Sequence, residues 1–364
     1  MQRSFLDHTP NELKEIFREL NLPSFRLNQV RNWLFARKTD DFDAMHNLPK
    51  ECRRILREHF GSPFAGKIVT ETISPDRTEK LLLQWPDANQ IECVLLRDDR
   101  NHRTGCISTQ VGCAMGCKFC ASGLDGFVRN LTRGEILEQI LRLNARLEHN
   151  ERLTHLVIMG TGEPLLNLPA LLSALEDAIA TNGLDMSARR ITISTVGIPK
   201  GIEKLGECGH PYKLAVSLHA PNDELREQIV PRNRVNGIRE IMDAAESYHR
   251  KSGRRITFEY VLIQNLNDQP QHAKELAFLL RGKTAIVNLI PFNPVPELPY
   301  QTPASRAVEQ FVAILREGSV QVKIRFRKGD RIAAACGQLR RRFSSQHDQA
   351  VFKFRNLHAE NADE

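Results

Sequence analysis

From about residue 103 onward, short apolar runs alternate with amphipathic segments that have the period of a helix. Six of these runs are rich in β-branched or apolar residues, as expected of strands buried on both faces; they span residues 104–109, 155–159, 190–195, 213–218, 256–262 and 285–290. Thr132 and Glu135 form a capping box at the start of one intervening helix. The alternation predicts an α/β protein with a parallel sheet. Six units are too few for a closed eight-stranded barrel, so we expect an open partial (βα)6 barrel, with a doubly wound sheet as the alternative.

The segments on either side of this core have different patterns. Residues 1–65 predict small helices, which would form an N-terminal accessory domain. Residues 66–102 form a strand-rich linker region, with candidate strands at 67–72, 80–84 and 91–96. The core and a C-terminal extension occupy 103–345, and 346–364 is a polar tail. Asn236 and Thr302-Pro303 give start signals for later helices, and a further strand is expected at 320–326.

Composition excludes several classes of protein. Hydrophobic residues are 41% of the chain and charged residues 26%, which excludes a disordered or collagen-like chain. No run approaches the roughly 18 apolar residues of a membrane-spanning helix, so no membrane partner is expected. An acid at Asp7 precedes any apolar stretch, which argues against a secretory signal. We expect a cytoplasmic protein.

Positive charge gathers near the C-terminus. The formal net charge is +7, and residues 323–342 contain eight Lys and Arg residues against a single acid, Asp330, so this stretch could account for all of it. A basic patch favours an anionic partner such as nucleic acid. A solvated basic face is an equally good interpretation of the charges alone.

Four of the eight cysteines lie close together. Cys113, Cys117 and Cys120 have the spacing Cys-x3-Cys-x2-Cys, and Cys106 precedes them. Three thiolates this close can wrap an inorganic cluster. Zinc would ordinarily take four protein ligands, for which Cys106 or His102 is available.

The cysteine spacing, placed after the first core strand, resembles that of the radical S-adenosylmethionine (radical-SAM) superfamily. The resemblance implies a [4Fe-4S] cluster, one per chain, on Cys113, Cys117 and Cys120, with SAM bound to the fourth iron. It also implies SAM contacts at strand ends and in the turn after the last core strand: Gly162, Glu163, Ser194, Ser217, Leu218, His219 and Asn293. Taken singly, Ser194 could be a strand-end cap, His219 a hydrogen-bonded core histidine, and Asn293 a turn former.

Further motifs narrow the resemblance. The chain contains Cys106-Ile-Ser-Thr-Gln-Val-Gly-Cys113, Gly126-Phe-Val-Arg-Asn-Leu131, Ser217-Leu-His-Ala-Pro-Asn222 and Ala335-Cys336-Gly-Gln-Leu339. Together they are similar to the RlmN/Cfr family of RNA adenine methyltransferases, over essentially the whole chain. Glu163-Pro164 and the general pattern resemble RlmN, which methylates C2 of adenine, more closely than Cfr, which methylates C8.

This family resemblance implies a mechanism that uses two further cysteines. One SAM methylates Cys336, and a second SAM, bound to the cluster, is cleaved to a 5′-deoxyadenosyl radical that abstracts hydrogen from the S-methyl group. The resulting carbon radical adds to adenine. Glu92 removes the ring proton, and Cys106 attacks the sulfur of Cys336 to release the product and leave a disulfide. Glu92 could instead be an exposed strand carboxylate. Cys52, Cys93 and Cys208 have no motif partner and are expected to be small buried hydrophobes.

The resemblance also implies the partners. The substrates would be an adenosine in the peptidyl-transferase centre of 23S rRNA and the adenosine 3′ to the anticodon in tRNAs. A base must be extruded to be methylated on a ring carbon, and single-stranded RNA loops offer such bases at the lowest cost. A flavodoxin-like electron donor and a thiol reductant would support a monomer that consumes two SAM per turnover. The N-terminal helices with Trp33 would bind RNA, or form an ordinary helical cap. Rival interpretations are a C8 methyltransferase, a non-enzymatic iron–sulfur RNA-binding protein, and an activase that makes a glycyl radical.

Overall fold

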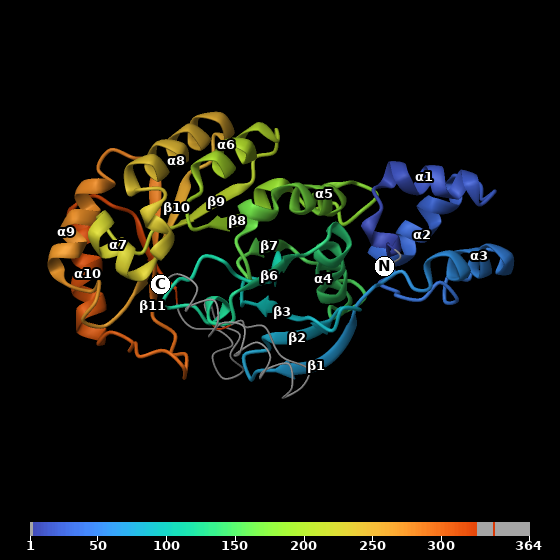
Figure 1. Cartoon of the computed structure of the whole chain (residues 1–364), viewed down its shortest axis with the longest axis horizontal. Coiled ribbons are helices and arrows are strands. Elements are labelled where there is room, and N and C mark those ends of the chain that lie inside the picture. Colours follow the sequence, from blue (N-terminus) through green and yellow to red (C-terminus); the bar gives the residue numbers. More distant parts are fainter. Residues whose placement is uncertain (1–2, 326–337, 339–364) are drawn as a thin grey trace, which may run out of the picture.

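Seven parallel strands and three antiparallel strands form one ten-stranded sheet, with the antiparallel strands together at one edge (Figure 1). The structure is a computed structural model that describes residues 3–325 and residue 338, so Cys336 and most of the basic C-terminal segment lie outside the described residues. The strands of this sheet, in spatial order, are β1 (Lys67–Ile73), β2 (Glu79–Gln84), β3 (Gln90–Arg97), β4 (Arg103–Cys106), β7 (His155–Ile158), β8 (Ile191–Thr195), β9 (Lys213–Ser217), β10 (Ile256–Leu262), β11 (Ala285–Pro291) and β12 (Val322–Ile324).

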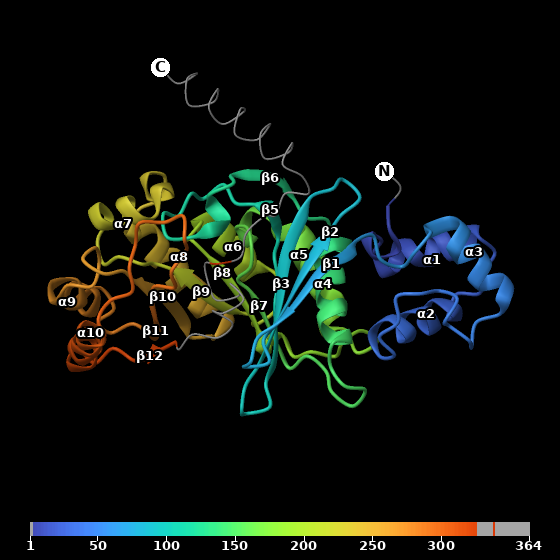
Figure 2. The ribbon, with the colours of Figure 1, turned by 90° about the horizontal axis from the view of Figure 1, so that it is seen from below.

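Helices connect the parallel strands and cover one face of the sheet (Figures 1 and 2). They are α4 (Arg133–Ala145), α5 (Leu168–Ile179), α6 (Pro199–Glu207), α7 (Asp223–Ile229), α8 (Ile238–Ser252), α9 (Pro270–Leu279) and α10 (Ser305–Glu317). The strands from β4 to β12 follow one another in chain order without a reversal. A doubly wound sheet would reverse its order at a switch point, so the partial barrel is confirmed and the alternative is wrong.

The first predicted core strand differs in its extent. The chain leaves the large sheet after Cys106 and forms β5 (Gln110–Gly112), which pairs with β6 (Phe127–Asn130) in a separate antiparallel hairpin. Only the first part of the predicted run 104–109, up to Cys106, is strand in the large sheet; residues 107–109 connect β4 to β5. The hairpin encloses the whole cysteine segment.

The strand-rich region before the core is part of the same sheet. Strands β1, β2 and β3 pair antiparallel with one another, and β3 pairs antiparallel with β4, with Val94 opposite Cys106. These three strands widen the sheet beyond β4, at the bottom of the view in Figure 1.

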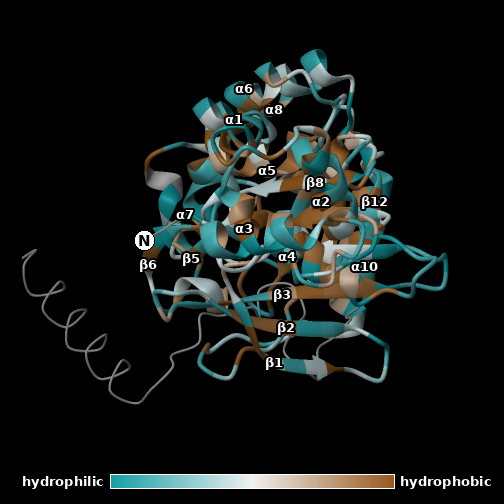
Figure 3. Cartoon of the chain, turned by 90° about the vertical axis from the view of Figure 1, so that its right-hand side faces the viewer, coloured by the Kyte–Doolittle hydropathy of each residue, from teal (hydrophilic) through white to brown (hydrophobic). Residues whose placement is uncertain are grey.

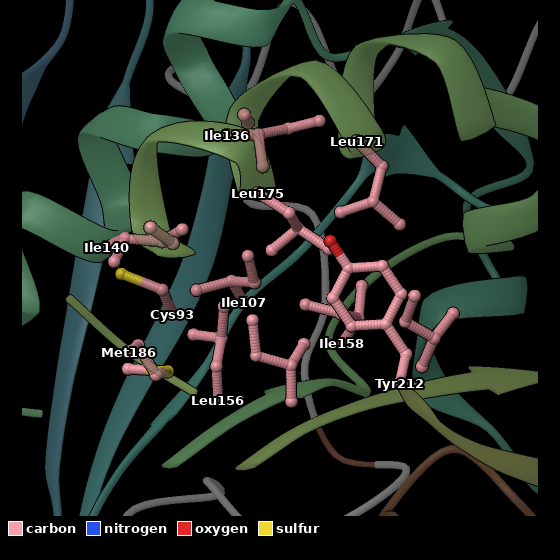
Figure 4. Close-up of a cluster of buried hydrophobic side chains, with 14 of the residues drawn as sticks. Cys93, Ile107, Ile136, Ile140, Leu156, Ile158, Leu171, Leu175, Met186 and Tyr212 are labelled. Atoms are coloured by element: carbon pink, nitrogen blue, oxygen red, sulfur yellow. The ribbon is translucent and has the colours of Figure 1, made fainter. Parts of the chain in front are cut away.

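The two faces of the sheet have opposite character. Side chains that alternate outward from the strands, such as Cys93, Leu156 and Ile158, are fully buried against α4 and α5 (Figure 4). In Figure 3, apolar residues gather toward the sheet while the outward faces of α6 and α8 are hydrophilic. Polar and small side chains such as Ser194 and Ser217 alternate onto the other, concave face. The concave face therefore carries the polar side chains that a functional site needs.

A helical N-terminal unit packs against this core, as predicted. After a short 3-10 turn, η1 (Phe5–Asp7), it contains α1 (Pro10–Glu19), α2 (Phe25–Phe35) and α3 (Lys50–Phe60). Asp7 accepts a hydrogen bond from Gly134 N at the start of α4 (3.0 Å). Asp177 on α5 binds both Arg31 on α2 (2.7 Å) and Arg133, and all three side chains are at least nine-tenths buried.

Of the three predicted helix starts, one is confirmed and two lie at other residues. Thr132 caps α4 and Glu135 closes the capping box, as expected. Gly237 rather than Asn236 is the N-cap of α8, since Asn236 binds Glu240 instead (3.2 Å). Ala304 rather than Thr302 precedes α10, because the Thr302 hydroxyl donates to Phe292 O (2.8 Å). Within the described residues, no helix combines the length and apolar character needed to cross a bilayer.

Candidate functional site

A hairpin holds the cysteine segment as a closed loop. Cys113 N donates to Gly126 O (2.9 Å) where β5 and β6 meet. Gly112 has φ +71°, and a Cβ built there would lie 1.8 Å from Gly126 O. Only glycine fits this position, because both the backbone conformation and the close approach exclude a side chain.

The three cysteines of this loop line one cavity at the ends of the parallel strands. The cavity, counted with its open mouth, has a volume of about 1050 Å³, at the upper limit of the sizes usual for small-molecule and cofactor sites. Burial raises the pKa of Cys113 to about 12 and the pKa of Cys117 well above its usual range, and in both the neighbouring Cys120 adds to the effect. Burial also raises the pKa of Cys120. Thiolates here therefore need a compensating cation, which iron supplies.

The donor set fits a cluster better than a single ion. Across residues 3–325 and 338, no group of three or more His, Cys, Asp or Glu side chains is arranged to hold one metal ion. Cluster ligands bind different iron atoms, so they lie farther apart than the ligands of one zinc. Three thiols that line one cavity match the ligand arrangement of an iron–sulfur cluster.

Glu163 forms part of the wall beside the cysteines. Gly162 has φ +109°, and a Cβ there would lie 2.6 Å from Gln110 Cβ. Gln110 Oε1 accepts from Glu163 N (2.8 Å), while the Glu163 carboxylate accepts from Leu165 N (3.0 Å) and Val196 N (2.8 Å). Burial raises the pKa of Glu163 to about 7. The carboxylate is thus fixed in place and would gain from a cationic group in the cavity.

Two serines at neighbouring strand ends also line the cavity. Ser194 is on β8 and Ser217 on β9, both on the concave face. Asn293, in the turn after β11, lines the cavity as well and is 6% exposed. Leu218 is fully buried and is not among the lining residues; its N–H donates to Glu259 O (3.0 Å).

His219 is both a buried, hydrogen-bonded histidine and a lining residue. Its Nδ1 accepts from Val261 N (3.0 Å), and its ring meets the Phe119 ring edge-on, with centroids 4.6 Å apart. Burial lowers its pKa to about 3, with the charge of Arg226 as a smaller cause. The ring is therefore neutral at physiological pH, and because Nδ1 accepts, the proton is on Nε2.

Cys106 and Glu92 lie outside the lining of the cavity but share the concave face. Cys106 is 8% exposed at the end of β4 and packs with Met159, which does line the cavity. Glu92 precedes Val94, the register partner of Cys106, by two residues on β3, which places it on the same face. It is 2% exposed and forms an ion pair with Lys80 (3.0 Å), so the alternative of an exposed strand carboxylate is wrong.

The other cysteines and Trp33 have the environments expected of structural residues, with one exception. Cys52 and Cys93 are buried in the core, whereas Cys208 is only half-buried. Trp33 is half-buried, and its Nε1 donates to Asn47 Oδ1 (2.5 Å).

Sequence reasoning missed two functional candidates. Glu259 on β10 lines the cavity, is paired in register with Ser217 and accepts from Asn288 Nδ2 (2.9 Å). A single acid inside an otherwise apolar strand was a signal for it. Arg226 on α7 is 1% exposed next to the cavity wall, and nothing in the local pattern of that helix distinguishes it from a surface arginine.

Comparisons with known proteins agree with this geometry. The profile of the Radical SAM superfamily matches residues 107–277, and that of the ribosomal RNA large subunit methyltransferase N-terminal domain matches residues 4–61. A solved structure, a radical SAM methyltransferase from Sphaerobacter thermophilus, is 41% identical, with a TM-score of 0.89 over 92% of this chain and 98% of that one.

Curated relatives are equally consistent. A probable dual-specificity RNA methyltransferase RlmN from Rhodopirellula baltica is 54% identical over 92% of this chain and 90% of its own length. One with the same name from Symbiobacterium thermophilum is 44% identical over 92% and 91%.

The open parallel barrel, with three cysteines looped over the ends of its strands, defines a radical-SAM enzyme, a class that uses a [4Fe-4S] cluster and SAM. With the RNA methyltransferase N-terminal domain added, the assignment narrows further. The chain belongs to the RlmN family of SAM-dependent RNA methyltransferases.

Proposed function

We propose that this enzyme methylates C2 of an adenosine in RNA, using a methyl group carried by Cys336 and released by Cys106. The observation that carries the proposal is the placement of Cys106 and Glu92 on the concave face, next to the cavity lined by the three cysteines. A thiol and a carboxylate with no part in holding a cluster then lie where a substrate base would meet the cofactors.

Residues of the cavity are assigned to the cofactors. Cys113, Cys117 and Cys120 hold one [4Fe-4S] cluster, and SAM lies against Gly162, Glu163, Ser194, Ser217, His219 and Asn293, whereas Leu218 supports this wall from the core. When bound, cluster and SAM supply a 5′-deoxyadenosyl radical by reductive cleavage. The Glu163 carboxylate suits the ammonium of SAM, and neutral His219 offers Nε2–H as a donor.

The remaining residues act on the methyl group and the base. Cys336 accepts a methyl group from one SAM, so a turnover consumes two. Glu92 takes the proton from the substituted ring carbon; its ion pair with Lys80 requires the carboxylate form, which is the form that can accept a proton. The radical adduct returns one electron to the redox chain that supplied it. Cys106, as a thiolate, then attacks the sulfur of Cys336, the bond from that sulfur to the methylene carbon breaks, and this carbon takes up a proton to become the methyl group. An external thiol reduces the resulting disulfide.

The proposed substrates are 23S rRNA, at an adenosine of the peptidyl-transferase centre, and tRNA, at the adenosine 3′ to the anticodon. The relatives are named dual-specificity RNA methyltransferases, which supports two RNA substrates. Lys323 and Arg325 begin the basic segment that leads to Cys336 and supply charge for a phosphate backbone. We further propose a cytoplasmic monomer that receives electrons from a flavodoxin-like donor.

Product analysis tests the proposal. Anaerobically reconstituted protein is incubated with SAM, a reductant and unmodified 23S rRNA fragment or tRNA, and the nucleosides are compared by mass spectrometry with 2-methyl and 8-methyl standards. We expect 2-methyladenosine, its loss in Cys336→Ala, and its retention in the control Cys208→Ala. Formation of 8-methyladenosine would contradict the C2 assignment, and SAM cleavage without a methylated base would contradict the substrate.

A further inference from the structure

Arg226 is a buried cation that donates hydrogen bonds to three backbone carbonyls. It lies on α7 and is 1% exposed. Its Nε donates to Leu218 O (3.0 Å), and its Nη2 donates to Ser217 O (3.1 Å) and Val196 O (2.5 Å). Bringing a guanidinium into the interior is costly, so this position indicates a use for the charge or for the geometry it holds.

The three carbonyls belong to the segments that form the SAM wall. Val196 N donates to the Glu163 carboxylate (2.8 Å), and Ser217 lines the cavity next to His219. One guanidinium therefore fixes the chain after β8 to the chain after β9. Removing it would let the two segments move independently.

The same helix is fastened to the cysteine loop. Lys118 N donates to Ile229 O at the end of α7 (2.9 Å). Leu225 and Ile229 of α7 pack in the same apolar cluster as Cys117 and Cys120. Burial lowers the pKa of Arg226 only to about 10, with the charge of Asp223 opposing the shift, so the side chain is a cation at neutral pH on the helix that packs against the cysteine loop.

We propose that Arg226 is a positioning residue with two effects: it holds the wall that binds SAM, and its charge favours the reduced state of the cluster. The second effect rests on the proposed function, in which Cys113, Cys117 and Cys120 hold the cluster. Reduction adds an electron to a centre that already carries three thiolates. A cation nearby, shielded from water, stabilises that additional negative charge.

Two variants separate charge from geometry. Arg226→Gln removes the charge, whereas Arg226→Lys keeps it but cannot reach all three carbonyls in the same way. Lys38→Gln is the matched control, because Lys38 Nζ also donates to three carbonyls, of Leu147 (3.0 Å), Glu148 (2.7 Å) and Glu151 (2.9 Å), yet does not line the cavity.

The test is a redox titration followed by electron paramagnetic resonance, with SAM affinity measured on the same reconstituted preparations. At the potential that half-reduces the wild-type cluster, Arg226→Gln is expected to have a ratio of reduced to oxidised cluster about tenfold lower, a shift of about 59 mV for one electron. Arg226→Lys should keep the ratio within about twofold but bind SAM several-fold more weakly. Lys38→Gln should change neither.

Two results would overturn the inference. One is Arg226→Gln with full iron content and a wild-type ratio; the other is Arg226→Lys with wild-type SAM affinity, which remains informative if the Gln variant does not fold. Failure of the cluster assignment on which the second effect rests looks different, since wild-type protein would then hold no cluster to titrate.

Discussion

At the scale of single residues, Glu163 shows how burial prepares a ligand site. Both carboxylate oxygens accept backbone N–H groups, yet burial outweighs these bonds and raises the pKa to about 7. Burial makes the ionised form of this fixed carboxylate unfavourable, and a bound cation would offset that cost. Gly162 makes this possible because its positive φ brings the chain against Gln110.

The pKa of Glu163 predicts how SAM binding depends on pH. Below about pH 7 the group is protonated and neutral, and above it the group is ionised and attracts the ammonium of SAM. Between pH 6 and pH 8 the ionised fraction rises about tenfold, so SAM should bind about tenfold more tightly at pH 8. Equilibrium dialysis with reconstituted protein measures this change.

Glu163→Gln provides the comparison, because glutamine keeps the shape without the titration. Its SAM affinity should be lower at pH 8 and nearly constant over the range. An equally steep pH dependence in this variant would assign the titration to another group.

At the scale of elements, the β5–β6 hairpin is the device that presents the cysteines. It closes a loop of fourteen intervening positions, 113–126, and leaves the large sheet at Cys106. The sequence predicts a strand up to residue 109 because Ile107 and Thr109 are β-branched, but residues 107–109 lie between β4 and β5 and belong to neither strand. The change of partner depends on Gly112 meeting Gly126 across the loop, a contact that local propensity does not reveal.

A substitution at Gly112 should open this hairpin. In Gly112→Ala the new Cβ would lie 1.8 Å from Gly126 O, and the φ of +71° is also unfavourable for alanine. We expect less than about a tenth of the wild-type iron after reconstitution, measured by iron assay and visible absorbance. Gly209→Ala is the control, because Gly209 has φ +76° but no atom within 4 Å of the built Cβ. Iron content near wild type in Gly112→Ala would contradict this role.

The order of the core strands could be predicted from sequence, whereas the pairing of the preceding strands could not. Apolar runs separated by helices give a parallel sheet in chain order, and strand ends then meet at one edge, which is why the cysteines, Glu163, Ser194 and Ser217 come together as expected. The attachment of β3 to β4 is a non-local pairing with no separate sequence signal. It nevertheless determines the environment of Glu92, whose partner Lys80 comes from β2.

At the scale of the whole molecule, buried ion pairs fasten the N-terminal helices to the barrel. Asp177 on α5 is shared by Arg31 from α2 and Arg133 from α4. The N-terminal helices are thereby held in a defined position relative to the cavity. A shared carboxylate between two arginines is a means of fixing that orientation, since each partner lies on a different element.

Loss of this carboxylate should destabilise the whole protein. Asp177→Asn would leave two buried arginines without their anion, at a cost of about 3–5 kcal/mol in the free energy of unfolding. Asp185→Asn, which removes an exposed pair with Arg152 (3.6 Å), should change it by less than about 1 kcal/mol. Denaturant titration measures both. Equal effects of the two substitutions would show that the buried network contributes little.

Trapping the covalent intermediate tests whether Cys106, on the concave face, releases the product from Cys336. Cys106→Ser protein, incubated anaerobically with SAM, reductant and substrate RNA, is analysed by denaturing electrophoresis and mass spectrometry for RNA attached to protein. The control is Cys93→Ala, since Cys93 neighbours Cys106 in the sheet but points into the core on the opposite face (Figure 4). We predict a covalent RNA adduct on Cys336 in Cys106→Ser, and released methylated RNA without adduct in Cys93→Ala. Release of methylated RNA by Cys106→Ser at the wild-type rate would contradict the proposed role of Cys106 in product release.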